Sequence, residues 1–520
     1  MDEEFSLDDP TQLLESASNF AHHPGSLNDA AVKDFLDRFP LPTKSDVPGL
    51  ENTLVACLER VFKTKYGASL IPQYMTFVQV GLKADSQIVR CLSCKTVSSF
   101  LKNFDDKSIY AIKLIIDCDI YPLLLDCRVN GDEQVATAAI DAIKNLAQFP
   151  EAMGIIFPSN FNEATHLGNV ASRCSSLGRV RVLSLIVKLF SISSSIASVI
   201  YNSNLLSLLE TEIKNSNDTL VTLSALELLY ETVMQLTEVQ HGAQFLARTT
   251  FQLLHSIISN SSMESILRSR ALMISGRLLS KENIYMFVDE PSAKSLISAI
   301  DVRLGLLDSQ DTDERESALE ALGGIGSIQG AVLLLTSFPP AARHIVHAAF
   351  DRQGGGKQLA ALHALGNIVG ENRPEDGVIL NGDAEESLRR LVYEVASESS
   401  KLTPSGLLLS VLQQAAEFRL AGYRVITGLV ARVWCLMEIC SKPEIISIVT
   451  DPTAETTKIA MEARYNCCKA IHKSFMSSKL VSDPALSGIA GKLQEAVQRG
   501  PYLVRKHTEA TPVVMTAERF

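Results

Sequence analysis

The chain has 520 residues, of which 46% are hydrophobic, 21% charged and 6% aromatic. That apolar fraction is ordinary for a folded protein and excludes a wholly disordered chain. The 48 Lys and Arg residues against 59 Asp and Glu give a net charge of −11, and no local stripe of basic residues offsets it. Because an acidic chain repels phosphate backbones, nucleic acid is excluded as the main ligand.

The first 50 residues are acidic and punctuated by prolines, so we expect a partly ordered cap there. Residues 1–9 lack the basic and apolar regions of a secretory signal, and none is expected. The apolar runs are short, and the run at 182–190 is broken by Lys188, so no membrane partner is expected. We expect a cytoplasmic protein, with the nucleus as a further location, whose ten cysteines are mostly reduced.

Residues 51–500 carry apolar residues at i, i+3, i+4 and i+7, a pattern that predicts helices nearly everywhere. The segment Ala-Ala-Ile-Asp-Ala-Ile-Lys-Asn-Leu-Ala at 138–147 recurs most clearly at 317–325 and 360–368, with weaker copies elsewhere. Further copies are expected at 424–429 and 463–471. The aligned residues of the first seven copies are Ser93, Ala139, Arg181, Ala225, Ala271, Ala318 and Ala361, with steps of 46, 42, 44, 46, 47 and 43 residues.

A second marker has the same phase, because Gly154, Gly242 and Gly330 lie 88 residues apart, or two repeats of 44. We expect a tight turn or a close helix approach at each of these glycines. Helical repeats with this period predict an all-α fold, a right-handed α-solenoid of about nine to eleven armadillo/HEAT-like repeats. No inter-domain linker is visible, so residues 51–500 are expected to form one continuous solenoid, with a loop insertion at 371–386 and a tail at 501–520.

Motifs for chemistry fail on inspection. The segment 354–357 ends in Gly-Lys, but a phosphate-binding loop needs Gly and Ser or Thr where Asp351 and Gln358 stand. Gly324 and its neighbours are interpreted as helix-packing residues. Cys91 and Cys94 form a lone CxxC inside a repeat, interpreted as buried thiols. We expect no catalytic residues, no metal site and no cofactor, and hence no enzyme.

A solenoid exposes an extended concave face that binds proteins. Armadillo proteins that bind extended cargo carry a Trp on the third helix and an Asn four residues later. Here the Trp position holds Asp141, Glu227, Glu320 and His363, which disfavours a nuclear-import adaptor. The same alignment predicts a partly acidic groove for a basic partner surface; the alternative is an ordinary solvated helix face. The predicted partner-binding residues are Asp141, Asn145, Glu227, Glu231, Glu320 and Asn367.

The segment Ala-Arg-Tyr-Asn-Cys-Cys-Lys-Ala-Ile at 463–471 is followed by Gly-Pro-Tyr-Leu-Val at 500–504 and by a short tail with Thr508, Thr511 and Glu518. Together with 132–157 and 218–246, which includes the His241-Gly242 pair, these stretches resemble the 26S proteasome non-ATPase regulatory subunit 5 family. The resemblance runs from about residue 85 to 510, and it carries over no family contact residues.

The resemblance implies an assembly chaperone for the base of the proteasome regulatory particle. Such a protein binds the C-terminal domain of an ATPase subunit, and a large non-ATPase base subunit is a further candidate partner. It leaves before the mature complex forms, and we expect a monomer when it is free. The alternative is a generic armadillo-repeat scaffold in signalling or ubiquitin pathways.

Overall fold

The computed structural model describes residues 14, 17–18, 49–103, 108–160, 163–215, 217–236, 242–306, 312–327, 330–370 and 380–502. Within these ranges the regular structure is helical and no strand occurs, which confirms the predicted all-α solenoid class. The chain divides into two compact units, 1–246 and 247–520, each described by itself below. Most of the predicted cap at 1–50 and the tail from 503 lie outside the described residues.

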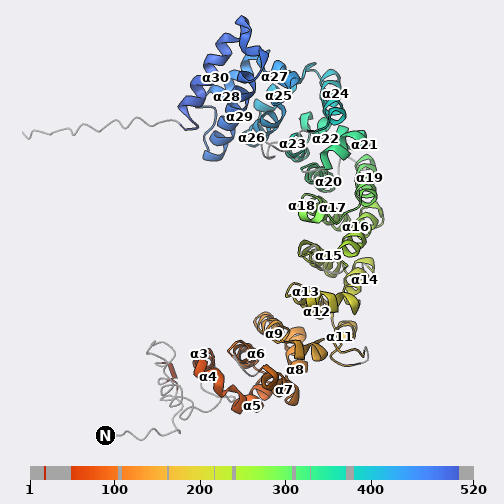
Figure 1. Ribbon diagram of the computed structural model, residues 1–520, viewed down its shortest axis with the longest axis vertical. Helices are drawn as coiled ribbons and strands as arrows, with labels where there is room; N and C mark the ends of the chain where they lie inside the picture. Colours follow the sequence, from red (N-terminus) through yellow and green to blue (C-terminus); the bar gives the residue numbers. More distant parts are fainter. Residues whose placement is uncertain are drawn as a thin grey trace, which may run out of the picture. The chain divides into compact units, whose positions relative to one another are not determined.

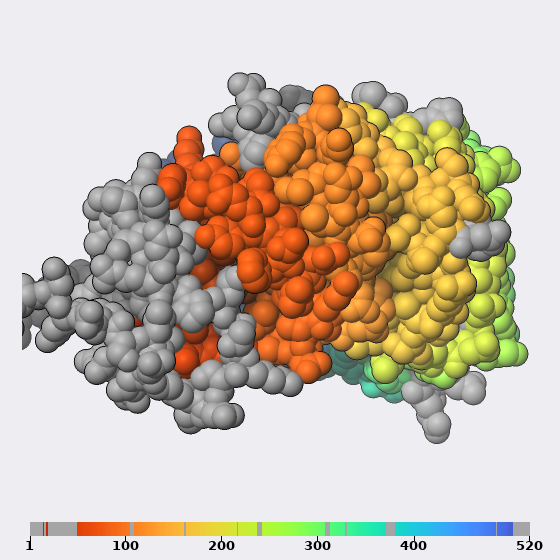
Figure 2. Space-filling view, turned by 90° about the horizontal axis from the view of Figure 1, so that it is seen from below, coloured from red at the N-terminus to blue at the C-terminus, as the bar shows by residue number. Residues whose placement is uncertain are grey.

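Short loops connect most of the successive helices of unit 1 (Figure 1). They are α3 (Leu50–Phe62), α4 (Lys65–Leu70), η1 (Ile71–Tyr74), α5 (Met75–Leu82), α6 (Gln87–Lys102), α7 (Ser108–Asp117), α8 (Ile120–Asn130), α9 (Glu133–Leu146), η2 (Pro150–Ala152), α10 (Met153–Ile156), α11 (Leu167–Arg173), α12 (Ser176–Phe190), α13 (Ser194–Asn202), α14 (Ser207–Asn215) and α15 (Thr219–Met234). Figure 2 shows described residues of this unit from one side, coloured from red through orange to yellow in chain order. The helices α5 and α7 expose Phe77, Val80, Ile109, Tyr110 and Ile116.

The unit boundary falls inside α16 (Ala243–Ser259), so a helix and not a linker lies there. The helices of unit 2 are α17 (Ser265–Leu279), α18 (Glu282–Tyr285), α19 (Glu290–Leu306), α20 (Thr312–Ile325), α21 (Gly330–Ser337), α22 (Pro339–Phe350), α23 (Gly355–Val369), α24 (Gly382–Glu398), α25 (Pro404–Leu412), α26 (Ala416–Leu429), α27 (Val433–Cys440), α28 (Pro443–Thr450), α29 (Lys458–Met476), η3 (Lys479–Ser482), η4 (Pro484–Leu486) and α30 (Ser487–Arg499).

Every copy of the sequence repeat lies in a helix, and these helices stack on one another. In unit 1, α6 packs on α9, α9 on α12 and α12 on α15; in unit 2, α17, α20, α23, α26 and α29 form a second series. We call these nine helices the ladder helices. Two shorter helices precede several of them, as α7 and α8 precede α9 and α21 and α22 precede α23, which gives a three-helix repeat.

An arginine recurs as the fourth residue of a ladder helix and joins it to a carboxylate on another helix or loop. Arg90 Nη2 lies 2.6 Å from Asp126 Oδ2 on α8. Arg268 pairs with Glu314 through two contacts of 2.8 and 2.9 Å, and both residues are buried. Because a bidentate pair fixes both partners, the Arg268–Glu314 pair sets the angle between α17 and α20. The further members are Arg179, which faces Glu212, and Arg419, which faces Glu455.

Glycines bring three ladder helices of unit 2 into backbone contact. A Cβ on Gly276 would lie 2.6 Å from the Cα of Ala321, and one on Gly323 would lie 2.5 Å from the Cα of Ala364. A Cβ on Gly324 would lie 2.7 Å from the carbonyl oxygen of Gly276. The interpretation of Gly324 as a helix-packing residue is confirmed.

The glycines at 88-residue spacing behave differently from one another. Gly242 has a φ of 79°, and a Cβ there would lie 2.5 Å from the Tyr201 ring, so the expected close approach is present. At Gly154 no atom lies within 4 Å of an added Cβ and the residue is helical, so the expectation is wrong at that position. The predicted loop at 371–386 is also too long, because α24 begins at Gly382; residues 371–379 lie outside the described residues.

The two C-terminal stretches on which the resemblance depends contact each other in unit 2. Arg464, on α29, is buried and donates from Nη2 to the carbonyl oxygen of Pro501 at 3.4 Å. The Tyr465 hydroxyl donates to the carbonyl oxygen of Val497 at 3.3 Å, and the Tyr502 hydroxyl donates to Glu462. The Gly-Pro-Tyr segment therefore packs against α29, the last of the described ladder helices.

No single described helix is long and apolar enough to span a membrane. Only α20 and α21 taken together, with a 115° bend between them, reach that length and composition.

Candidate protein-binding face

The second, ninth and thirteenth residues of each ladder helix lie on one stripe, because steps of seven and eleven residues return close to the same side of an α-helix. We call the surface formed by these stripes the ladder face of each unit. In unit 1 its side chains are exposed or half-buried. The ninth residues there are Lys95, Asp141, Ser184 and Glu227, and the thirteenth are Ser99, Asn145, Lys188 and Glu231.

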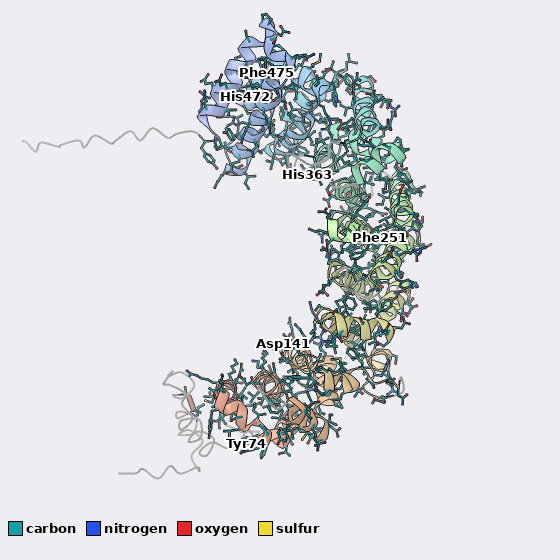
Figure 3. The ribbon with its side chains drawn as sticks, viewed as in Figure 1. Tyr74, Asp141, Phe251, His363, His472 and Phe475 are labelled. Carbon is teal, nitrogen blue, oxygen red and sulfur yellow. The ribbon has the colours of Figure 1, made fainter. Side chains whose placement is uncertain are left out.

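Asp141 and Asn145 are both on α9 but have different surroundings. Asp141 is exposed and lines a hollow of about 650 Å³ between α3, α6 and α9 (Figure 3). Asn145 donates from Nδ2 to Ser98 Oγ at 2.6 Å and so ties α9 to α6. The structure therefore leaves Asp141 available to a partner, whereas Asn145 already holds two repeats together.

The wall of this hollow has mixed charge. Glu59 on α3 accepts from Lys63 at 2.7 Å and from Lys95 at 2.9 Å. Burial alone would raise the pKa of Glu59, but the two lysines outweigh it and lower that pKa. Lys102 and Glu133 complete the charged wall beside Asp141. The hollow is therefore not the acidic one that the repeat alignment predicts.

Glu227 and Glu231 lie half-buried on α15. Glu231 forms an ion pair with Lys188 of α12, the neighbouring ladder helix, and also accepts from Gln235 at 3.4 Å. Ser184 of α12 separates Glu227 from Asp141 along the ninth-residue row. The predicted carboxylates thus lie on one face but do not form a continuous acidic row, and their role in partner binding stays a prediction.

In unit 2, Glu320 is exposed on α20 and Asn367 is half-buried near the end of α23. His363, the ninth residue of α23, lies 2.7 Å from the guanidinium of Arg424, the ninth residue of α26 (Figure 3). Burial and the charge of Arg424 both lower the pKa of His363. Among the ninth residues of the described ladder helices of unit 2, Glu320 is the single carboxylate.

The alignment missed an apolar row at the second residue of the ladder helices. In unit 1 this row holds Ile88, Leu177 and Leu220, with 43%, 60% and 75% of each residue exposed, and Gln134 between the first two. Scattered exposed apolar residues are common, but repetition at one register position makes a row. The signal was present in the sequence as an apolar residue two places after three of the four capping residues, for instance Ser175 before Leu177.

The described residues hold no group of three or more His, Cys, Asp or Glu that could bind a metal ion. Cys91 and Cys94 are buried, as their CxxC spacing inside a helix predicted. Burial raises the pKa of Cys57 to about 11 and that of Cys440 to about 11, so these thiols stay protonated and unreactive. Lys357 pairs with Asp351 at 2.6 Å. Asp351 stands at the position where a phosphate-binding loop has glycine.

A family model described as Proteasome non-ATPase 26S subunit matches residues 50–268. The 26S proteasome non-ATPase regulatory subunit 5 of Bos taurus is 20% identical over 458 residues, or 87% of this chain and 85% of the relative. The Homo sapiens protein of the same name is 20% identical over 460 residues, with the same coverage.

Among solved structures, a crystal structure of a Kap121p mutant matches with a TM-score of 0.50 at 14% identity. It covers 94% of this chain, which spans about half, 54%, of the Kap121p chain. At this identity the likeness concerns the solenoid fold alone.

Proposed function

From the premise that the chain is related to the 26S proteasome non-ATPase regulatory subunit 5 family, we propose that it is an assembly chaperone for the base of the proteasome regulatory particle. It binds the C-terminal domain of an ATPase subunit and leaves before the mature complex forms. The observation that carries this proposal is similarity over 87% of the chain to relatives of that name. The relatives are non-ATPase subunits, which supports a non-catalytic, proteasome-related role.

The ladder face of unit 1 is the proposed binding surface. All four of its ladder helices, α6, α9, α12 and α15, fall within the residues that the family model matches. Its apolar second-residue row supplies area to bury, and the mixed-charge rows beside it supply pairs that select a partner. Leu177 and Leu220, on successive ladder helices, are the most exposed residues of the apolar row.

Release requires a difference in affinity between the free subunit and the assembled ring. Moving a population from 1:99 to 99:1 takes about 5.5 kcal/mol of differential binding. A steric clash with neighbouring ATPase subunits that compete for the same surface can supply such a difference without any chemistry on the chaperone. A ladder face spread over four successive helices suits this mechanism, because a neighbouring subunit can displace it one helix at a time.

The first test is affinity purification of the tagged chain from its own cells, with mass spectrometry of the proteins that accompany it. We expect free ATPase subunits of the regulatory particle, with or without a large non-ATPase base subunit, and no stoichiometric core particle. Recovery of mature proteasome would indicate a stable constituent instead. Absence of every proteasome component would reject the proposal and favour the generic scaffold.

The second test locates the binding surface by changing Leu177→Asp and Leu220→Asp together. Each leucine that is buried on binding contributes about 1.5–3 kcal/mol, so we expect affinity for the ATPase domain to fall at least about tenfold. Ile459→Asp is the matched control, because Ile459 has the same register position on α29 in unit 2 and is 68% exposed. An equal loss in both variants would contradict the assignment to unit 1. Calorimetric titration gives both affinities.

A further inference from the structure

Unit 2 contains a hollow of about 430 Å³ between α19, α20, α22 and α23. Its polar wall consists of Arg315, Arg343, His344, His347 and Lys357, and no carboxylate is among the lining residues. The remainder of the wall is largely apolar and includes Leu304, Leu319 and Pro340. In a chain of net charge −11, this concentration of basic side chains is an exception.

Two other hollows show what distinguishes this one. The hollow between α3, α6 and α9 includes Glu59, Glu133 and Asp141 beside its lysines. The hollow lined by α16 and α19 includes Asp289, whose Oδ2 lies 4.0 Å from Arg248 Nε. In both, the cations face carboxylates across the same wall, so an incoming anion would meet repulsion as well as attraction.

We call the hollow between α19, α20, α22 and α23 the basic hollow. The carboxylates that pair with its Arg343 and Lys357 are not among its wall residues. Arg343 contacts Glu394 at 3.5 Å and also Glu398, both on α24, and its side chain is still 46% exposed. Lys357 pairs with Asp351 at 2.6 Å. A guanidinium has five N–H donors and an ammonium has three, so these pairs orient the two cations and leave donors for a ligand.

We propose that this hollow binds a carboxylate-rich segment of a partner protein that also presents an apolar side chain. The carboxylates face Arg315, Arg343 and Lys357, and the apolar side chain packs on the wall formed by Leu304, Leu319 and Pro340. Nucleic acid fits less well, because a phosphate backbone would use the cations but not the apolar wall and would meet the acidic remainder of the chain. The site is independent of the proteasome assignment and is additional to the ladder face of unit 1.

His344 makes this binding depend on pH. His344 Nε2 lies 3.8 Å from Asp301 Oδ1 of α19, and Arg315 of α20 and His347 of α22 also face it. Burial lowers the pKa of His344; Arg315 and His347 lower it further, and Asp301 opposes them. An anion in the hollow favours the protonated imidazole. Affinity should therefore rise as the pH falls below about 6.5, the ordinary pKa of histidine.

The test uses the full chain and a short fluorescein-labelled peptide that alternates glutamate and leucine, followed by fluorescence anisotropy. We expect saturable binding that weakens at least about tenfold in the double variant Arg343→Glu, Lys357→Gln, because two attractive charges are lost and one repulsive charge is gained. Arg390→Glu is the matched control, since Arg390 lies on α24, is 62% exposed and is not a wall residue. The affinity of the Arg390→Glu variant for the peptide should stay within about twofold of that of the wild type.

Three outcomes would overturn the proposal. The first is equal weakening in Arg390→Glu, and the second is equal binding of a peptide with glutamine in place of glutamate. The third is absence of saturable binding to the wild-type chain. If an oligo-dT of similar charge displaces the peptide at a lower concentration, the ligand of the hollow is nucleic acid and not a protein segment. His344→Gln should remove the pH dependence while a circular-dichroism melt shows that the variant is folded.

Discussion

The ladder helices of unit 1 and unit 2 are held together in different ways. In unit 1 they are linked by polar pairs between helices, such as Asn145 with the buried Ser98 and the part-exposed Lys188 with Glu231. In unit 2, α17, α20 and α23 meet through glycine at backbone distance, and the Arg268–Glu314 pair is buried. Surface pairs contribute little and can be exchanged, whereas overpacking a close contact or removing one partner of a buried ion pair is strongly destabilising. Unit 1 can therefore vary its exposed face without losing its stack.

The beginnings of the helices show the same contrast. The four ladder helices of unit 1 each start with a side-chain cap, for example Asp132, whose Oδ1 accepts from the Val135 N–H at 2.8 Å. In unit 2, α17, α23 and α26 start without one, whereas α29 is capped by Thr457. A cap stabilises a helix locally by about 1 kcal/mol. Local caps therefore stabilise every ladder helix of unit 1 but not α17, α23 and α26 of unit 2.

The largest expected effect is that of Glu314→Ala. Glu314 is buried and accepts from both Arg268 and Arg303, so its removal leaves buried guanidinium charge without a partner. We expect a loss of about 3–5 kcal/mol in the free energy of unfolding, measured by urea denaturation followed by circular dichroism. A loss below about 1 kcal/mol would remove the distinction between the units.

The same residue predicts a pH dependence. Burial would raise the pKa of Glu314, but hydrogen bonds and charge from Arg268 and Arg303 outweigh it and lower that pKa. A carboxyl with a lowered folded-state pKa contributes stability above its unfolded pKa, about 4.5, and loses that contribution as the pH falls through the folded value. The stability gap between wild type and Glu314→Gln should therefore narrow below about pH 4.5.

Gly323→Val comes next in size. The new Cβ would lie 2.5 Å from the Cα of Ala364, and backbone cannot move aside as a flexible side chain would. We expect a destabilisation of about 1–3 kcal/mol or more from overpacking. Gly491→Ala on α30 is the control, because nothing lies within 4 Å of its added Cβ and a helical Gly→Ala change is neutral or stabilising. Equal melting temperatures for the two variants would contradict the close-packing argument.

The smallest effect is expected for Lys188→Ala in unit 1. The side chains of Lys188 and Glu231 are 40% and 32% exposed, so water and salt screen their ion pair. We expect a change of at most about 1 kcal/mol, which disappears near 1 M salt. A loss as large as that of Glu314→Ala would show that unit 1 depends on its surface pairs as strongly as unit 2 depends on its buried ones. Urea denaturation at two salt concentrations measures the difference.

The sequence was sufficient for the repeats because one ladder helix per repeat obeys the same apolar pattern, from Ser93 in α6 to Ala361 in α23. It was insufficient for the site because partners across repeats depend on the offset between neighbouring helices. Glu231 aligns with Asn145, yet one pairs with a lysine and the other with a serine. A period also cannot distinguish a glycine needed for close approach from one that is not, as Gly242 and Gly154 show.

The contact of Arg464 with Pro501, and of Tyr502 with Glu462, has a consequence for how this chain can lengthen during evolution. Repeat proteins grow by duplication, and a new copy appended at an end needs an open apolar surface to stack on. Here α30 and the Gly-Pro-Tyr segment occupy that surface on α28 and α29. Duplications that survive in this lineage should therefore be insertions upstream of α27, with the last repeat and its closing segment inherited as one block.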